Sequence, residues 1–226
     1  MSFDTKLSKQ GEKLLQMYQS MASNGYNQAD GTKVASAYNE FEMRKFRQIC
    51  QPYFHFHNIN TVLDFGAGGS DWDAPDFDLE TRKSAKKFFD VEQVFYFEPA
   101  RNLLTKRKSD CVVCMDVLEH IFISDVPKIV DELFSLTEKL LIVNIACYEA
   151  NALLPNGENA HITVRSPDWW KGVFDVISLN HKDVEVLLIC SKDFVSGIIY
   201  EKYKSADWEL SKSFVTNVIG QNFKPS

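Results

Sequence analysis

The sequence contains no apolar run of the ~18 residues that a membrane-spanning helix needs. Its first residues, Met-Ser-Phe-Asp-Thr-Lys, lack the apolar core of a signal peptide. We therefore expect a cytoplasmic protein with no membrane partner.

Positive charge is also scarce, because 25 Lys and Arg face 31 Asp and Glu, which gives a net charge of -6. Binding to nucleic acid through its phosphates requires a basic surface, so we expect no nucleic-acid partner. A local basic patch at Lys106, Arg107 and Lys108 leaves that alternative open. A small molecule is the partner that the composition favours.

The five cysteines include one pair with CxxC spacing, Cys111 and Cys114, but no second CxxC and no nearby His pair that would complete a zinc site. On a strand, residues three apart face opposite sides. We therefore expect structural thiols and no metal or redox centre.

Repeats and low-complexity tracts are absent as well, and 226 residues with 45% hydrophobic content suit one domain with a sizeable core. We expect a helical cap over residues 1–58 and a sheet core over residues 59–226. Apolar spacing predicts helices at 5–22, 34–50, 79–89, 117–136, 167–177 and 211–220, and strands at 61–65, 93–97, 111–115, 140–146, 184–190 and 195–203.

The most informative segment is Thr61-Val-Leu-Asp-Phe-Gly-Ala-Gly-Gly-Ser70, in which an apolar strand ends in an acid and a glycine turn. Such a turn lets a ligand approach the backbone closely. The segment from Asp110 to Ile121 repeats this logic, because an apolar strand ends in polar residues and leads into a helix. Two such strand ends side by side form a ligand crevice.

Together these segments resemble the S-adenosylmethionine (SAM)-dependent methyltransferases. The family's first motif, apolar-apolar-acid-x-Gly-x-Gly, is matched by Val62, Leu63, Asp64, Gly66 and Gly68, and Asp116-Val-Leu-Glu-His-Ile121 looks like its fourth strand end and following helix. The resemblance implies an α/β, Rossmann-like sandwich, whose mostly parallel sheet has an antiparallel edge strand and N-terminal helices. It implies SAM as the cofactor, and it implies that Glu98 accepts hydrogen bonds from the ribose hydroxyls. The cofactor-binding residues that it implies are Asp64, Gly66, Ala67, Gly68, Glu98, Pro99, Met115, Asp116 and Val117.

Two features depart from the family pattern. Only Pro99 to Asp110 separates Glu98 from the next strand, which is too short for the usual helix, third strand and adenine-binding loop. We expect the third strand to be lost and adenine to be recognised by Met115 and Asp116 or by Trp72. The acidic and aromatic insertion 71–78 is expected to fold over the cofactor.

Catalytic candidates come from the histidines. His161 lies in a long polar loop after the predicted strand 140–146, with Glu158 and Arg165 nearby, and His120 lies close to the expected sulfonium position. A His with a pKa near neutrality is the usual base when an acceptor must lose a proton. The loop also supplies the substrate-binding candidates Glu158, Asn159, Arg165 and Trp169. In the alternative interpretation, Glu158, Asn159 and His161 only hold the loop in shape, and His120 only braces its helix.

The function we predict is transfer of a methyl group from SAM to oxygen or nitrogen of a small polar acceptor, by a monomer or homodimer. One alternative is a SAM-fold protein that has lost catalysis and acts as a binding or scaffold module. A nicotinamide-dependent oxidoreductase is less favoured. A Gly-x-Gly-x-x-Gly fingerprint that starts at Gly66 needs a glycine at position 71, where this sequence has Asp71. The charge of Asp71 would also repel a pyrophosphate.

Overall fold

The computed structural model describes residues 6–35, 41–203, 208 and 210–215. Over these residues it contains five α-helices: α1 (Lys9–Asn24), α2 (Met43–Phe56), α3 (Ala85–Phe89), α4 (Val126–Leu136) and α5 (Pro167–Ser178). The main sheet consists of β3 (Thr61–Phe65), β4 (Gln93–Glu98), β5 (Leu103–Leu104), β6 (Ser109–Met115), β7 (Thr137–Ala146), β9 (Glu185–Ser191), β10 (Ser196–Lys202) and β11 (Leu210–Val215). A small sheet joins β1 (Tyr26–Gln28), β2 (Lys33–Val34) and β8 (Ala152–Leu153), and two 3-10 turns are η1 (Pro99–Arg101) and η2 (Leu118–His120).

The main sheet has the strand order β11-β10-β9-β7-β6-β3-β4-β5. The five strands from β9 to β4 are parallel, whereas β5, β10 and β11 run antiparallel to their neighbours. The expected α/β class and mostly parallel sheet with an antiparallel edge are confirmed.

The strand order reverses at β3. From β3 the chain goes to β4 on one side and then returns to β6 on the other. In open α/β sheets, ligands bind at the carboxyl ends of the strands where this reversal occurs. The glycine turn follows β3 and Asp116 follows β6, so both predicted strand ends lie at this position.

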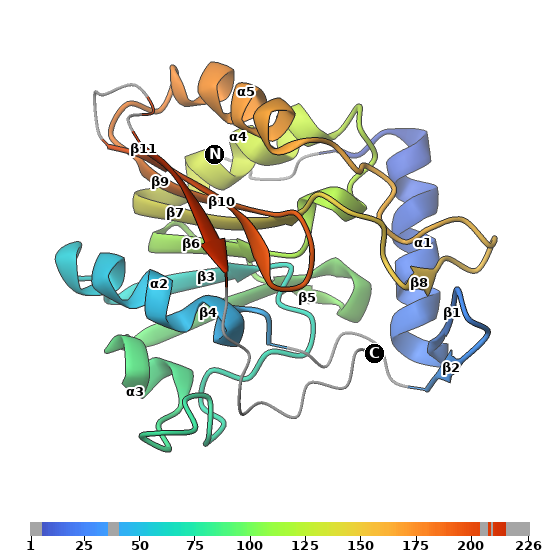
Figure 1. Ribbon diagram of the computed structural model, residues 1–226, viewed down its shortest axis with the longest axis horizontal. Coiled ribbons are helices and arrows are strands. Elements are labelled where there is room, and N and C mark those ends of the chain that lie inside the picture. The colour runs from blue at the N-terminus through green and yellow to red at the C-terminus, as the bar shows by residue number, and fades with distance from the viewer. Residues whose placement is uncertain (1–5, 36–40, 204–207, 209, 216–226) are drawn as a thin grey trace.

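Alternating side chains fill a core on each face of the sheet. Figure 1 shows α4 and α5 on one side of the sheet and α2 and α3 on the other. Val112 and Cys114 face the layer that contains α4 and α5, and Cys111 and Val113 face the layer that contains α2 and α3. Cys111 and Cys114 therefore lie on opposite faces of the sheet, as their spacing predicts. Helix α1 covers neither face and stands across one end of the sheet (Figure 1).

The segment between β4 and β6 contains no parallel strand among its described residues. It forms η1 and then the two-residue β5, which pairs antiparallel with the end of β4. We expected the third parallel strand to be lost. At its place the short connection forms only the two-residue antiparallel strand β5.

Tertiary contacts changed several predicted helices. Helix α3 begins at Ala85 instead of residue 79. Before it, Thr81 hydrogen-bonds to the Asp78 carboxylate and Arg82 has a left-handed backbone (φ 59°). Ser84 then caps the helix by accepting a hydrogen bond from the Lys87 N–H.

The predicted helix 34–50 is α2, which begins only at Met43 because Val34 pairs in β2. The predicted helix 117–136 is split into η2 and α4. The C-terminal helix prediction is wrong for residues 211–215, which form β11, and residues 216–220 lie outside the described part of the chain. The predicted start at Ser166 and Pro167 is confirmed in α5.

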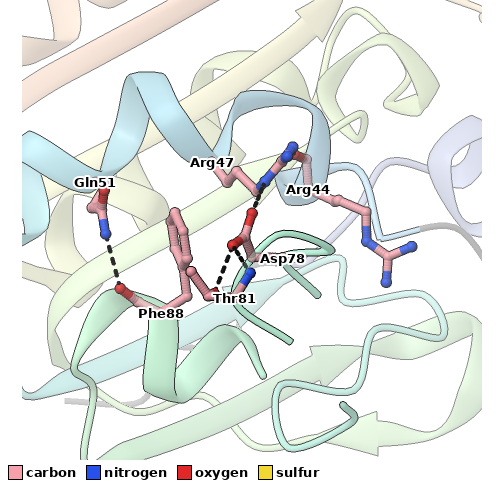
Figure 2. Close-up of polar contacts among 6 residues, drawn as sticks. All are labelled: Arg44, Arg47, Gln51, Asp78, Thr81 and Phe88. Carbon is pink, nitrogen blue, oxygen red and sulfur yellow. Dashed lines mark hydrogen bonds and ion pairs between the residues drawn. The ribbon is translucent and has the colours of Figure 1, made fainter. Parts of the chain in front are cut away.

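The insertion 71–78 packs under the sheet and does not fold over the crevice. Trp72 and Phe77 are buried in the core beside α2 and α3, and the buried Asp78 carboxylate accepts from Arg47 Nε (2.9 Å) and from the Thr81 hydroxyl (2.6 Å) (Figure 2). Gln51 on α2 also donates to the carbonyl oxygen of Phe88 (3.2 Å; Figure 2). The insertion therefore joins α2 to α3.

None of the helices in the described part of the chain is long and apolar enough to cross a membrane.

Candidate active site

A cavity of about 810 Å³ lies at the carboxyl ends of β3, β4 and β6, between the sheet and α1. Its lining includes every residue that the resemblance assigned to the cofactor and both candidate histidines: Asp64, Gly66, Ala67, Gly68, Glu98, Pro99, Met115, Asp116, Val117, His120 and His161. The topological crevice and the predicted residues thus meet in one place.

The glycine turn after β3 is tied to both neighbouring strands. The N–H groups of Gly66 and Ala67 donate to the Phe97 carbonyl oxygen at the end of β4 (2.7 and 3.1 Å). Gly66 has a φ of 80°, and a Cβ there would lie 2.3 Å from Cγ2 of Val117 beyond β6. Glycine is therefore required for the backbone angle and for the close approach of the two strand ends.

Glu98 closes the turn from the end of β4. Its carboxylate accepts from the Gly68 N–H (3.0 Å) and from the Ala100 N–H (2.9 Å). Burial raises the pKa of Glu98, and these two backbone donors oppose the shift. A carboxylate has about four lone-pair positions, so these two bonds leave acceptor capacity toward the cavity.

Asp64 is almost fully buried at the end of β3. It accepts from the Ser70 hydroxyl (2.6 Å) and from Nε1 of Trp72 (2.8 Å). Burial raises the pKa of Asp64 to about 6, although both donors favour the ionised form. Trp72 has no exposed surface and does not line the cavity, so it supports Asp64 from behind and cannot contact adenine there. Met115 and Asp116 do line the cavity.

His120 and His161 face each other, with ring centroids 4.8 Å apart. Nδ1 of His120 lies 2.9 Å from the Ala160 carbonyl oxygen, and Nδ1 of His161 lies 2.6 Å from that of Tyr148. A carbonyl oxygen only accepts hydrogen bonds, so both rings donate from Nδ1, and in a neutral ring of this tautomer the lone pair lies on Nε2. Burial lowers the pKa of His120 to about 4, so its ring is neutral at pH 7.

Asp116 joins the two histidines in one cluster. Its carboxylate and one nitrogen of each ring lie within 4.8 Å of one another. Burial alone would raise the pKa of Asp116, but the nearby His120, His161 and Lys45 and a hydrogen bond with Glu119 hold it below its ordinary value. Burial and the Asp116 charge raise the pKa of neighbouring Glu119 well above its usual range, and Glu119 accepts from the Ala146 N–H. The cluster therefore joins two buried acids to two histidines.

The four substrate-binding candidates do not line the cavity. Asn159 instead stabilises its own loop, because its amide bonds to both backbone groups of Ala150 and to the His161 N–H. Glu158 is exposed and bonds to Asn156, whereas Arg165 is exposed and lies over the Trp169 ring. The loop residues thus position His161, as the structural alternative for Asn159 supposed, while the polar side chains of Glu158 and Arg165 stay outside.

The apolar wall of the cavity consists of residues that the sequence did not single out as site candidates. It comes from one face of α1, which contributes Leu14, Tyr18 and Met21 at helical spacing, and from Leu7 just before the helix. The Tyr18 hydroxyl donates to the Ala160 carbonyl oxygen (2.6 Å) and lies 3.0 Å from Nδ1 of His120. A tyrosine within an apolar stripe was the available signal, since a buried hydroxyl needs a partner.

Charge in the cavity is strongly one-sided. Among its described lining residues the acids are Glu42, Asp64, Glu98, Asp116 and Asp125, whereas Lys106 is the only Lys or Arg. Lys106 pairs with Glu132 (2.8 Å). Within the described part of the chain, Asp64, Glu98 and Asp116 have no Lys or Arg at ion-pair distance. The cavity therefore favours a cationic ligand over an anionic one.

A scan against protein-family models finds no match for this chain, and searches of curated proteins and of solved structures find no match either.

Proposed function

We propose that this chain is a SAM-dependent methyltransferase with a Rossmann-like fold, and that it methylates oxygen or nitrogen of a small acceptor. The observation that carries the proposal is the glycine turn after β3, held by Glu98 of β4 and pressed against Val117 after β6, at the reversal of strand order. This arrangement brings a glycine turn and an acid to the position where such folds bind nucleotide-like ligands.

The residues present fit a cationic nucleoside cofactor. Glu98 offers acceptor positions for ribose hydroxyls, the turn at Gly66 and Gly68 permits close approach, and Asp64 lies on the acidic side of the cavity. When bound, SAM supplies an electrophilic methyl group on a sulfonium that is already a good leaving group. The remaining task of the chain is to position the acceptor and to manage its proton.

The acceptor side combines an apolar wall with the two histidines. Leu14, Tyr18 and Met21 of α1 give an apolar contact surface, while Nε2 of His161 or His120 provides a base for an acceptor hydroxyl or amine. We infer an acceptor with a polar reacting atom on a partly apolar body.

The dinucleotide alternative loses support from charge. An NAD pyrophosphate would enter a cavity whose described lining holds five Asp and Glu side chains and one Lys. The earlier argument from the Asp71 charge does not hold, because the Asp71 carboxylate accepts from the N–H groups of Asp73 and Ala74 and does not line the cavity. The missing glycine at position 71 still counts against the fingerprint.

Calorimetric titration with SAM, with its demethylated product S-adenosylhomocysteine, and with NAD tests the proposal. We expect micromolar binding of the SAM-type ligands and none of NAD.

Glu98→Gln keeps the side-chain size but removes the charge. It should weaken SAM binding at least about tenfold, in line with the 1.5–3 kcal/mol of a charge-assisted hydrogen bond. Glu92→Gln makes the same change at the opposite, exposed end of β4 and should have no effect. No heat with either SAM-type ligand would reject the proposal, and binding without turnover across an acceptor screen would favour the scaffold alternative.

A further inference from the structure

The cluster of Asp116, His120 and His161 has the donor set of a metal site. One ligand atom from each residue lies within 4.8 Å of the other two, and all three side chains line the same cavity. Tetrahedral bonds of ~2.1 Å need ligand atoms about 3.4 Å apart. Side-chain shifts of about 1 Å therefore bring the three atoms to coordinating distance.

The hydrogen bonds of the two rings prepare them for coordination. Both Nδ1 atoms are held by backbone carbonyl oxygens, those of Ala160 and Tyr148, and the Tyr18 hydroxyl also contacts the His120 ring. Such second contacts fix the tautomer and orientation of metal-binding histidines and leave Nε2 as the ligand atom. A catalytic base needs one ring nitrogen, whereas here one nitrogen from each of two rings lies close to a carboxylate.

The backbone at Asp116 gives an independent indication. Its φ is 60°, a left-handed conformation that few non-glycine residues adopt, and its N–H donates to the Asn144 carbonyl oxygen at the end of β7 (3.0 Å). Such backbone strain persists where the surrounding structure fixes it, commonly at functional sites. Here it places a carboxylate beside two histidines without a Lys or Arg at ion-pair distance in the described residues.

We propose that Asp116, Nε2 of His120 and Nε2 of His161 bind one divalent transition-metal ion, with its remaining coordination positions open to the cavity. Two imidazoles and one carboxylate suit Zn²⁺, Mn²⁺ or Fe²⁺ and disfavour the all-oxygen preference of Mg²⁺ and Ca²⁺. The sequence led us to expect no metal because only the Cys111 and Cys114 pair was considered as a ligand motif.

The metal would also define the acceptor class, a point that depends on the proposed methyl transfer. An oxygen bound to a divalent ion loses its proton at much lower pH than in water. The ion would therefore hold an acceptor hydroxyl as its oxyanion, with the proton released to solvent water because both Nε2 lone pairs are then bound to the metal. The oxyanion takes the methyl group and S-adenosylhomocysteine leaves. Acceptors with two adjacent oxygens would bind best because they chelate the ion. No oxidation or reduction is involved.

The first test uses the full chain, freed of metal by a chelator, and titrates it with Zn²⁺ and Mn²⁺ by calorimetry and with Co²⁺ by visible absorption. We expect one equivalent to bind. His161→Ala and Asp116→Asn should each weaken binding at least about 100-fold, because loss of even an outer partner of a ligand costs about 10- to 100-fold. Asparagine tolerates the left-handed backbone of Asp116, and His55→Ala removes an exposed histidine of α2 as the matched control.

Circular dichroism and SAM titration of the same variants separate the two proposals. A His161→Ala variant that keeps its fold and SAM affinity but loses the metal would support the site, and for Asp116→Asn, itself a candidate SAM-binding residue, the readouts are the fold and metal binding. Equal metal binding by the wild type and both site variants, or no binding by the wild type, would overturn it, whatever the outcome of the SAM titration. If His161→Ala lowers turnover while the wild type binds no metal, the histidines act as bases alone.

Discussion

At the scale of single residues, Asp64 links stability to pH. Burial raises its pKa from an ordinary 3.8 to about 6. Between those values the folded protein binds more protons than the unfolded chain, so the free energy of unfolding falls as pH rises from about 4 to 6 and then levels off. The shift corresponds to roughly 3 kcal/mol.

Asp64→Asn should remove this decline. Urea denaturation of both proteins from pH 4 to 7 measures it, and the variant should gain relative stability toward pH 7. Parallel curves for the two proteins would mean that Asp64 ionises normally. The Ser70 and Trp72 donors retain an oxygen acceptor in the variant, so the comparison isolates the charge.

Gly66 is a second residue at which a substitution should lower the free energy of unfolding. A methyl group there meets Val117 at 2.3 Å and the backbone stays at a φ of 80°. We expect Gly66→Ala to destabilise the fold by about 1–3 kcal/mol from the backbone angle alone, with the clash added. The double variant Gly66→Ala/Val117→Ala should regain only the part of the stability that the clash with Val117 removes. Thermal unfolding measures this, and Val117→Ala alone serves as the reference. Full recovery would show that the backbone angle carries no cost.

At the scale of elements, α1 is held to α4 through one buried carboxylate. The N–H and hydroxyl of Ser8 donate to Asp125 (2.9 and 2.7 Å), and the Ser8 oxygen accepts from the Gly11 N–H as the helix cap. Ser8→Ala removes the cap and one bond to a fully buried acid, so we expect a loss of about 1–3 kcal/mol in urea denaturation. Ser23→Ala, at the exposed other end of α1, should change stability by less than about 0.5 kcal/mol. Equal effects would show that Ser8 does not dock the helix.

The sequence predicted the elements with strong local signals and missed those decided by distant contacts. The strand Thr61–Phe65 matched because an apolar run ends at a glycine turn, and α5 matched because Ser166 and Pro167 form a local cap. The start of α3 depends on Asp78, whose partner Arg47 lies on another helix. The candidate histidines line the predicted crevice, but the orientation of Glu158 and Arg165 away from it depends on how the loop around Asn159 folds back.

At the scale of the whole molecule, the cavity joins parts of the chain that are distant in sequence. Its walls come from α1, from the turns after β3 and β4, from η2 and from the loop that carries His161. A ligand that binds there should stabilise the segments that it contacts against local opening.

Hydrogen exchange with and without saturating SAM tests this coupling. At about 100 times the dissociation constant, binding adds ~2.7 kcal/mol to the free energy of unfolding, which corresponds to roughly 5–10 °C in Tm for a chain of this size. We expect slower exchange at residues 66–70 and 116–122, and no change in α3, which does not line the cavity. Protection that extends strongly over α1 with SAM alone would instead mean that the cofactor covers the apolar wall, which would contradict its assignment to the acceptor.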